Sequence, residues 1–540
     1  MQPIRHVFLL TAIFSGTTLI AQPTDTLRQI DQLFAGWNNA TPGGAIRVSR
    51  NGVVLYNKAF GLADLEHAVP NTTETIFESG SVAKQFTAMA ILLLAQEGKL
   101  SVQDEIQKYV PEIPRYDAPI TIDHLLHHIS GLKDWGTIGA ISGWPRTTRV
   151  YTQDLALQIM ARQKSTNFRP GMEYSYSNSN YSLLVTIVER VSGKSLQAFM
   201  QERFFEPLGM QHTRWRYNFR EIIPNRSVAY QFNDGQYQQM MPFENIHGHG
   251  GLLTTTADLE KWNTLLTTHA IGGDRVYRER IRRGILTEGK EISYASGLVV
   301  EDFHGFQSIS HSGATAGYRA WLAWYPEKKI SVVVLSNASN ADVVGLGHRI
   351  ASIYLGEGTK KSTGTRKGIA LAPTDAERFA GVYRSARGYD VIRLERKENA
   401  ILSDGHELTP FHRDTLYLDG NHWIQKKAGV LLLQNPYDTT TYRRMPPAAT
   451  NNAGWSALVG TYYSEDADAW FKIAVRENKL WVDAPNLPSI ELKPAFADGF
   501  TAPDLDLYEF VRDKRGQVTG FQLSTSRALR VPFRKQSQKK

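Results

Sequence analysis

Residues 79–94 read SGSVAKQFTAMAILLL. The pair Ser79-Gly80 is a typical helix start, and the apolar residues behind it recur at helical spacing until they cover nearly the whole circumference. Gly98 predicts the end of this helix. A helix that is apolar almost all round belongs in the middle of a domain. The pattern therefore places Ser81 on the first turn of a buried helix.

Lys84 follows Ser81 by three residues, so both side chains lie on the same helix face. Free backbone N–H groups at a helix start favour developing negative charge. A hydroxyl with an amine one turn away is the layout of an activated serine nucleophile. The same spacing also fits an ordinary helix cap followed by a surface lysine. The pair therefore needs support from other parts of the chain.

The bulk composition is that of a globular protein of two or three domains, with 540 residues, 42% hydrophobic and 21% charged. The formal net charge is +8, but basic residues cluster near 360–367 and 534–540. We interpret these clusters as a solvated linker and tail and expect no nucleic-acid partner. The chain has no cysteine, so it has neither a disulfide nor a lipid-attachment cysteine.

The N-terminus is typical of a secretory signal peptide, residues 1–21. Arg5 and His6 precede an apolar run from Val7 to Ile13, and small residues lead to Ala21. The polar residues 15–18 leave this run too short to span a membrane. We expect a secreted protein, in the bacterial periplasm, with no integral membrane span after cleavage.

Residues 22–357 have the pattern of an α+β domain. Asn51-Gly52 predicts a hairpin, a helical stretch follows, and four strand-like runs come last. An antiparallel sheet completed by both ends of the domain and flanked by helices accounts for this order. The predicted strands are Ala45 to Val48, Val53 to Tyr56, Leu298 to Glu301, Phe306 to His311, Arg319 to Tyr325 and Ile330 to Ser336. The predicted helices include Leu27 to Trp37, Thr121 to Ile129, Tyr151 to Arg162, Tyr181 to Val191 and Thr256 to Leu266.

The C-terminal part of the chain contains an internal repeat. Residues 379–385 read FAGVYRS and residues 458–464 read LVGTYYS, and alternating strand patterns follow each of them. We predict two smaller all-β lobes, residues 373–446 and 447–540, after a polar linker at 358–372.

Tyr176-Ser177-Asn178 is the second segment with chemical potential, at the end of a loop just before a helix. A phenol whose pKa is lowered by a neighbouring ammonium group can accept the proton of a serine. An amide can hold either a substrate carbonyl group or the lysine.

His311-Ser312-Gly313-Ala314 is the third segment, at the end of a predicted strand. Gly313 allows a substrate backbone to lie close to the strand. The N–H of Ala314 can join that of Ser81 in an oxyanion hole.

Together, Ser81-Val82-Ala83-Lys84, Tyr176-Ser177-Asn178 and His311-Ser312-Gly313 make the chain resemble the class C β-lactamase-like serine hydrolases. This family includes penicillin-binding proteins, D-amino-acid-specific peptidases and esterases. The similarity covers roughly residues 30–355 and includes the phrases ITIDHLLHHISGL (120–132) and EPLGM (206–210).

The resemblance implies a β-lactamase-like fold, β-barrel-like lobes after the catalytic domain, and a role for each motif residue. It implies that Ser81 is the nucleophile and that Lys84 with Tyr176 handles protons. It also implies that Asn178 positions the substrate. The remaining substrate-binding residues that it implies are His311, Ser312, Gly313 and Ala314.

One position departs from the family pattern. In β-lactamases the third motif usually begins with a lysine, whose charge attracts the carboxylate of the antibiotic, whereas here it begins with His311. We therefore expect a hydrolase that cleaves an amide bond, including D-amino-acid-containing peptides, or an ester bond. A class C-type β-lactamase and a non-catalytic penicillin-binding sensor are the alternatives.

No cofactor or metal is expected, and the partner is a small-molecule or peptide substrate. His124 and His128 lie four residues apart, a spacing that also suits zinc, but the family phrase explains them as structural. The loop from Ala484 to Asp506 is the predicted wall of the site, and its aspartates are candidates to meet a substrate amino group.

Overall fold

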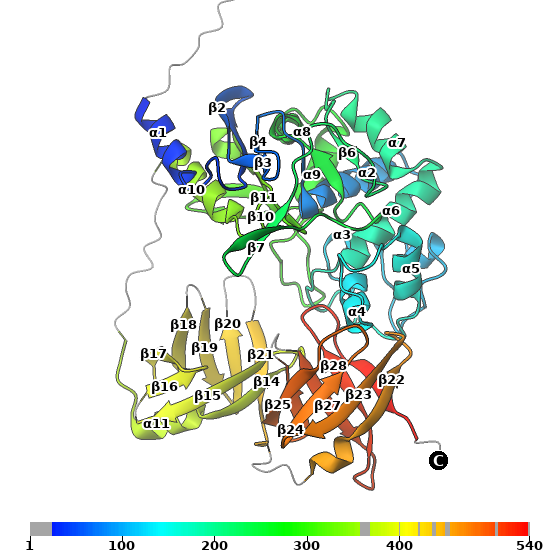
Figure 1. The fold of residues 1–540 in the computed structure, drawn as a ribbon, viewed down its shortest axis with the longest axis vertical. Coiled ribbons are helices and arrows are strands. Elements are labelled where there is room, and N and C mark those ends of the chain that lie inside the picture. Colours follow the sequence, from blue (N-terminus) through cyan, green and yellow to red (C-terminus); the bar gives the residue numbers. More distant parts are fainter. Residues whose placement is uncertain are drawn as a thin grey trace, which may run out of the picture.

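The computed structural model describes residues 24–356, 368–398, 400–419, 422–434, 439–448, 454–502 and 506–537. These residues form an N-terminal unit (24–356), a first lobe (368–448) and a second lobe (454–537), and Figure 1 shows both lobes lying against one side of the N-terminal unit. The predicted signal peptide and residues 358–367 of the predicted linker lie outside the described residues.

A six-stranded antiparallel sheet in the order β10-β11-β12-β13-β1-β2 is the centre of the N-terminal unit. Strand β1 lies between β2, its hairpin partner, and β13 from the end of the unit. The expected sheet, completed by both ends of the domain, is therefore confirmed. Its strands are β1 (Gly44–Arg50), β2 (Val53–Phe60), β10 (Val299–Phe303), β11 (Phe306–Thr315), β12 (Tyr318–Tyr325) and β13 (Ile330–Ser336).

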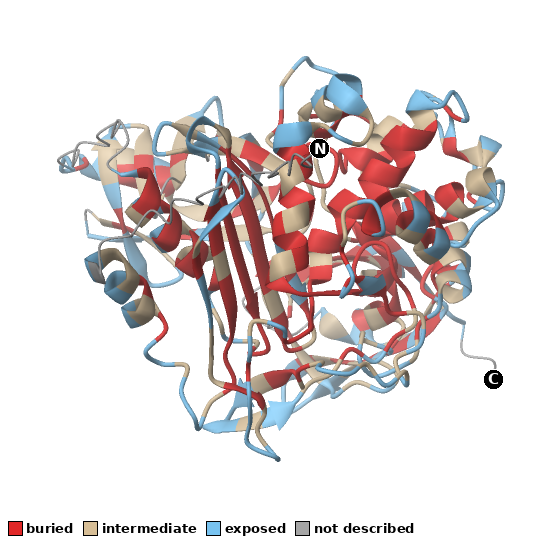
Figure 2. Cartoon of the chain, turned by 90° about the horizontal axis from the view of Figure 1, so that it is seen from above, coloured by how far each residue is buried: buried red, intermediate tan, exposed pale blue. Residues whose placement is uncertain are grey.

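Helices cover both faces of this sheet, because alternate side chains of its strands are apolar on both sides. On β13, Val332 and Val334 pack in a cluster with α1 (Thr24–Leu33) and α10 (Val343–Leu355). Val333 and Leu335 point the other way, into the cluster that contains α2 (Lys84–Gln96). Figure 2 shows the resulting buried strands between helical layers.

The other helices of the unit lie around α2. They are α3 (Ile122–Leu126), α4 (Trp135–Ile141), α5 (Gln153–Ala161), α6 (Asn178–Ser192), α7 (Leu196–Met200), α8 (Thr256–Thr268) and α9 (Gly273–Ile281). Short strand pairs and triplets complete the unit: β3 (Leu62–Asp64), β4 (Val69–Pro70), β5 (Phe77–Glu78), β6 (Arg214–Trp215), β7 (Tyr230–Asn233), β8 (Gln236–Gln239) and β9 (Leu252–Thr254). No helix in the described part of the chain has the length and apolarity needed to cross a membrane.

Each lobe is a closed eight-stranded antiparallel barrel, which confirms the two predicted all-β lobes. The repeated segments begin them: Tyr383 on the first strand of the first barrel and Tyr462 on the first strand of the second are both fully buried. The first barrel consists of β14 (Gly381–Ser385), β15 (Val391–Lys397), β16 (Ala400–Ser403), β17 (His406–His412), β18 (Thr415–Asp419), β19 (His422–Lys427), β20 (Val430–Gln434) and β21 (Thr439–Met445), preceded by α11 (Pro373–Phe379). The second consists of β22 (Gly460–Ser464), β23 (Ala469–Arg476), β24 (Lys479–Asp483), β25 (Ile490–Phe496), β26 (Gly499–Thr501), β27 (Leu507–Arg512), β28 (Val518–Ser524) and β29 (Val531–Lys535).

The second lobe packs closely against the N-terminal unit beside α4 and α5 (Figure 1). The Gln163 side chain donates to the carbonyl of Asp466 at 2.8 Å, and the Leu529 N–H donates to the side-chain oxygen of Asn167 at 2.7 Å. Because these polar groups are buried, the bonds fix the two parts in one arrangement.

Candidate active site

Ser81 lies on a single 3-10 turn, Gly80–Ala83, directly before α2. This turn runs so close to β11 that neither segment has room for a side chain where the two cross. A Cβ on Gly80, whose φ is +52°, would lie 2.6 Å from the backbone nitrogen of Ala314, and a Cβ on Gly313 would lie 2.0 Å from the carbonyl oxygen of Ser79. Gly313 therefore makes room for the serine turn itself, and not for the substrate backbone as the sequence suggested.

Gly313→Ala should move the serine turn away from β11 and lower turnover by about 100-fold, because catalysis is sensitive to small displacements of reacting groups. Turnover of a p-nitrophenyl ester and the melting temperature measure the effect. Gly36→Ala is the matched control, because a Cβ on Gly36 meets nothing within 4 Å. Full activity of the Gly313 variant would contradict this account of the crossing.

Lys84 begins α2 and is completely buried. Its amino nitrogen lies 3.2 Å from the Ser81 Oγ, 2.9 Å from the Asn178 Oδ1 and 2.7 Å from the carbonyl oxygen of His249. Burial, and then the positive charges of Arg527 and Arg146, hold the pKa of Lys84 well below its ordinary value of 10.5. A neutral amine beside the serine can accept its proton.

Tyr176 is the second group beside the serine, with its ring 4.7 Å from the Lys84 amino nitrogen. Burial raises the pKa of Tyr176 above its ordinary value, although a hydrogen bond from Ser81 opposes the shift. The lowered pKa that the sequence predicts for this phenol is therefore wrong. The buried phenol keeps its proton near neutral pH, so it is suited to donate a proton rather than to accept one.

Asn178, the first residue of α6, holds the lysine in place. Its side-chain oxygen accepts the bond from Lys84, and its backbone N–H donates to the Asp134 Oδ2 at 2.6 Å. Of the two roles that the sequence left open for this amide, the structure shows the contact with the lysine.

His311 lies within β11, which continues to Thr315, and not at the end of the strand as predicted. Its Nδ1 lies 2.6 Å from the carbonyl oxygen of Ser312, and its Nε2 lies 3.0 Å from the hydroxyl of Tyr294. Both ring nitrogens therefore contact the protein. The next residues alternate, so that Ser312 and Ala314 are exposed and line the cavity next to Ser81.

The ring of His311 should stay neutral down to about pH 4. Burial, with a contribution from the charge of Lys84, lowers the pKa of His311 from 6.5 to about 4. An NMR titration of ¹⁵N-histidine-labelled protein, assigned by the difference from His311→Gln, should therefore show no His311 protonation between pH 8 and pH 5. A His311 titration step near pH 6.5 would contradict the prediction.

The cavity beside Ser81 has a volume of about 310 Å³. It brings together every substrate-binding and catalytic candidate from the sequence except Lys84 and Gly313, which lie just behind its wall. Six further residues line it that were not predicted as site residues, and three of them have ionisable side chains: Arg146, His249 and Arg527. Arg527 belongs to the second lobe, and no local sequence pattern marks it, because only the docking of that lobe brings it to the site.

His124 and His128 do not converge on a common point. The His124 ring accepts a hydrogen bond from the backbone of Thr121, whereas the His128 Nδ1 accepts bonds from Ser177 and Asn180. His128 lies under the Tyr176 ring, with ring centroids 4.3 Å apart. These contacts are structural.

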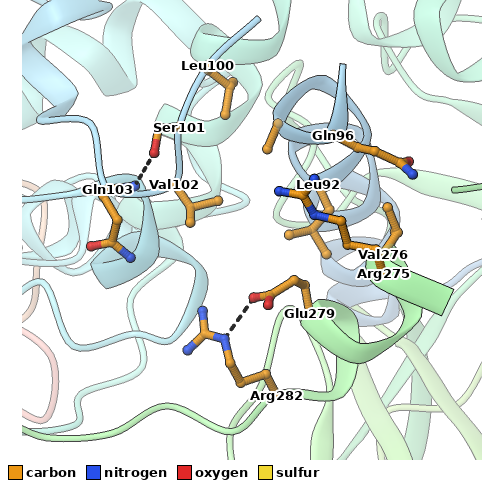
Figure 3. A pocket seen from close by; sticks show the side chains of 11 residues that line it. Leu92, Gln96, Leu100, Ser101, Val102, Gln103, Arg275, Val276, Glu279 and Arg282 are labelled. Carbon is orange, nitrogen blue, oxygen red and sulfur yellow. Dashed lines mark hydrogen bonds and ion pairs between the residues drawn. The ribbon is translucent and has the colours of Figure 1, made fainter. Parts of the chain in front are cut away.

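A larger cavity, of about 550 Å³, lies at the opposite end of α2 (Figure 3). It is lined by α2, α9 and the segment around Ser101, and its Glu279 and Arg282 form an ion pair of 2.8 Å. It contains none of the residues that the sequence motifs single out. The chemically equipped cavity is the smaller one, at Ser81.

Comparisons with known proteins agree with the motifs and the fold. The family model described as Beta-lactamase matches residues 25–355. Penicillin-binding protein 4* of Bacillus subtilis (strain 168) is 30% identical over 310 residues, which are 54% of this chain and 68% of the relative. A D-aminopeptidase of Cereibacter sphaeroides (strain ATCC 17029 / ATH 2.4.9) is 25% identical over 529 residues, 94% of this chain and 97% of the relative.

Among solved structures, the octameric penicillin-binding protein homologue from Pyrococcus abyssi has a TM-score of 0.56 and 25% sequence identity. The match covers 78% of this chain and 99% of that protein. Since the family model spans more than half of the chain and includes the serine turn, the lysine and the His-Ser-Gly strand, the chain belongs to the Beta-lactamase family.

Proposed function

We propose that the chain is an exported serine hydrolase that cleaves an amide or ester bond through an acyl-enzyme on Ser81. The observation that carries the proposal is the buried Lys84, whose amine lies 3.2 Å from the Ser81 Oγ. A buried lysine of lowered pKa next to a serine hydroxyl is the arrangement that turns a weak nucleophile into a strong one.

In the proposed mechanism, neutral Lys84 takes the proton as the Ser81 oxygen forms a bond to the substrate carbonyl carbon. The negative charge on the carbonyl oxygen is stabilised by backbone N–H groups of Ser81 and Ala314, which lie on either side of the close crossing. Tyr176 passes a proton to the leaving group as the carbon–nitrogen or carbon–oxygen bond breaks. Water then attacks the acyl-enzyme, its proton passes to the same groups, and the acid product leaves Ser81 free.

The proposed substrates are amides, including those of D-amino acids, and esters. Support comes from the similarity to proteins named D-aminopeptidase, which extends over 94% of the chain and therefore includes both lobes. A β-lactamase is less well supported, because His311 replaces the lysine that attracts the antibiotic carboxylate and its ring contacts Ser312 and Tyr294 instead. Export is proposed from the signal-like residues 1–21.

The test is a substrate profile of the purified protein. Paired D- and L-aminoacyl p-nitroanilides, p-nitrophenyl esters and nitrocefin are compared, with Ser81→Ala as the control for each. We expect Ser81-dependent turnover of the esters and of at least one amide, and slow or no turnover of nitrocefin. Rapid nitrocefin turnover would favour the β-lactamase, and labelling of Ser81 by penicillin without any turnover would favour a sensor.

A further inference from the structure

Arg527 lies in the loop between β28 and β29 of the second lobe and lines the cavity that contains Ser81. Its guanidinium carbon is 5.1 Å from the centre of the Tyr176 ring. A cation from a separate barrel therefore reaches the tyrosine that contacts the candidate nucleophile.

The loop that carries Arg527 is fixed to the N-terminal unit by its backbone. The carbonyl oxygen of Arg527 accepts hydrogen bonds from the Asp134 N–H and from the Asn167 side chain, both at 3.1 Å. Asn167 also accepts the bond from Leu529 described above, and its carbonyl oxygen accepts one from the Arg530 guanidinium. A side chain on such a braced loop is held ready for a ligand, so binding costs little ordering entropy.

Among the residues that the structure describes, the charge of Arg527 has no acidic counterpart. Within the described residues, no carboxylate lies in ion-pair distance of its guanidinium group, although the side chain is half-buried. Arg146, which lines the same cavity, differs because Glu244 binds it at 2.9 Å. None of the described residues that line the cavity at Ser81 is an aspartate or a glutamate. A planar cation without an acidic partner among the described residues, at the edge of a polar cavity, is suited to a carboxylate.

A cavity of about 890 Å³, called the second cavity from here on, lies between α4 and the mouth of the second barrel. It shares Arg146, Asn178 and Arg527 with the cavity at Ser81. Arg527 therefore stands at the junction of the two spaces. Most of the wall surface is apolar and includes Ala140 and Ile141 of α4 and Phe471, Leu487, Ile490 and Leu523 of the second lobe.

The carboxylates of the second cavity limit what it can receive. They are Asp134, Asp390 and Asp506. Asp134 accepts the Asn178 N–H. Negative charge on these groups disfavours a second anion deeper in the cavity. An anion is therefore best placed at Arg527, with an uncharged apolar group beyond it.

We propose that Arg527 of the second lobe binds a carboxylate group of the substrate and that the cavity at the barrel mouth receives an apolar group attached to it. The inference rests on the acyl-enzyme function proposed above and narrows its substrates to amphipathic anions: amides or esters with a carboxylate close to the scissile carbonyl. It reverses the sequence-based idea that aspartates of the second lobe select a free amino group.

The test uses phenylboronic acid and 3-carboxyphenylboronic acid, which differ only in the carboxylate. Boron accepts a lone pair of the serine Oγ, so binding reports on Ser81 without requiring turnover. Calorimetry on the full chain should show that the carboxylate strengthens binding about tenfold, as expected for a charge-assisted contact. Arg527→Gln should bring this ratio close to one. Arg527→Lys should keep part of it, because the charge remains but the planar fork is lost.

Arg387→Gln is the matched control. Arg387 lies on the rim of a neighbouring cavity and is paired with Glu173 at 3.0 Å, so its removal changes the net charge equally without touching the cavity at Ser81. The ratio of the affinities for the two boronic acids should stay as in the wild type. Melting temperatures of all variants identify any that fail to fold, and the Arg527→Lys variant then decides the role of the charge.

For the apolar part, Ala140→Phe narrows the second cavity from the α4 side. The substitution should weaken the binding of a 3-carboxyphenylboronic acid derivative that carries a hexyl chain. It should weaken the binding of 3-carboxyphenylboronic acid itself less. An equal effect on both compounds would overturn the assignment of this cavity.

The outcomes separate the two proposals. A wild-type ratio near one, or a ratio unchanged in Arg527→Gln, overturns the role of Arg527 even while Ser81-dependent binding of the neutral acid still supports the hydrolase. If neither acid binds the wild type more tightly than Ser81→Ala, the proposed acyl-enzyme function itself is overturned.

Discussion

Lys84→Met should lower turnover by about 10³-fold or more while leaving the protein folded. A methionine fills a similar volume but has no nitrogen to accept the proton of Ser81, which lies 3.2 Å away in the wild type. The variant also leaves the Asn178 side-chain oxygen and the His249 carbonyl without their donor, so a lower melting temperature is expected as well. Steady-state hydrolysis of a p-nitrophenyl ester and thermal melting measure the two effects.

Lys133→Met is a matched control for this experiment. Lys133 is a second buried lysine of the same unit, and its amine binds the Ser165 Oγ at 2.9 Å, away from Ser81. This variant should lose stability but keep most of its turnover. Comparable activity losses in both lysine variants would show that a buried lysine acts here only through stability.

The pH profile gives an independent check on Lys84. A base acts in its neutral form, so turnover should fall as the pH falls through the pKa of Lys84. Because burial and the charges of Arg527 and Arg146 hold that pKa well below 10.5, the enzyme should be active near neutral pH. Activity that develops only above about pH 10 would contradict a neutral Lys84.

Tyr176→Phe should lower the turnover of amides by about 100-fold or more, within the range for a lost proton-transfer group. The effect on p-nitrophenyl esters should be smaller, because nitrophenolate leaves without taking a proton. The physical basis is the raised pKa of the buried Tyr176, which keeps the phenol protonated next to Ser81. The ratio of amide to ester turnover is therefore the informative measurement.

Tyr174→Phe is the corresponding control. Tyr174 packs in the same aromatic cluster, with its ring 5.9 Å from that of Tyr294, but it does not line the cavity at Ser81. Its hydroxyl should be dispensable for the amide-to-ester ratio. An amide rate near the wild-type value in Tyr176→Phe would show that another group protonates the leaving nitrogen.

The sheet and the main helices could be predicted because their apolar periodicity is strong. Ile330 to Ser336 was predicted as a strand and is β13 with the same bounds, since it is buried on both faces. Helix α4 (Trp135–Ile141) was missed because it is short and contains Gly136 and Gly139, which weaken any helical pattern. The internal repeat predicts only that the lobes are all-β, because closure depends on pairing between distant strands, whereas the family resemblance implies barrel-like lobes and the structure confirms them.

The site, too, has parts that the sequence predicts and parts that it does not. Ser81 and Lys84 share one local turn, so their spacing predicts their contact. The crossing between Gly80 and Gly313 and the approach of Arg527 depend on how distant segments dock, and local patterns do not contain that information. The loop from Ala484 to Asp506 was the predicted wall. Its described residues Ala484, Leu487 and Asp506 line the second cavity, whereas the second lobe contributes Arg527 to the wall of the cavity at Ser81.

The most direct test of the account is to trap the acyl-enzyme. The full chain is mixed with a p-nitrophenyl ester, quenched in acid within the first turnover, and examined by intact mass and peptide mapping. We predict a mass gain of one acyl group on the peptide that contains Ser81, absent from Ser81→Ala and formed far more slowly in Lys84→Met. Turnover without any adduct, or an adduct on Ser177 or Ser312 instead, would contradict the assignment of Ser81 as the nucleophile.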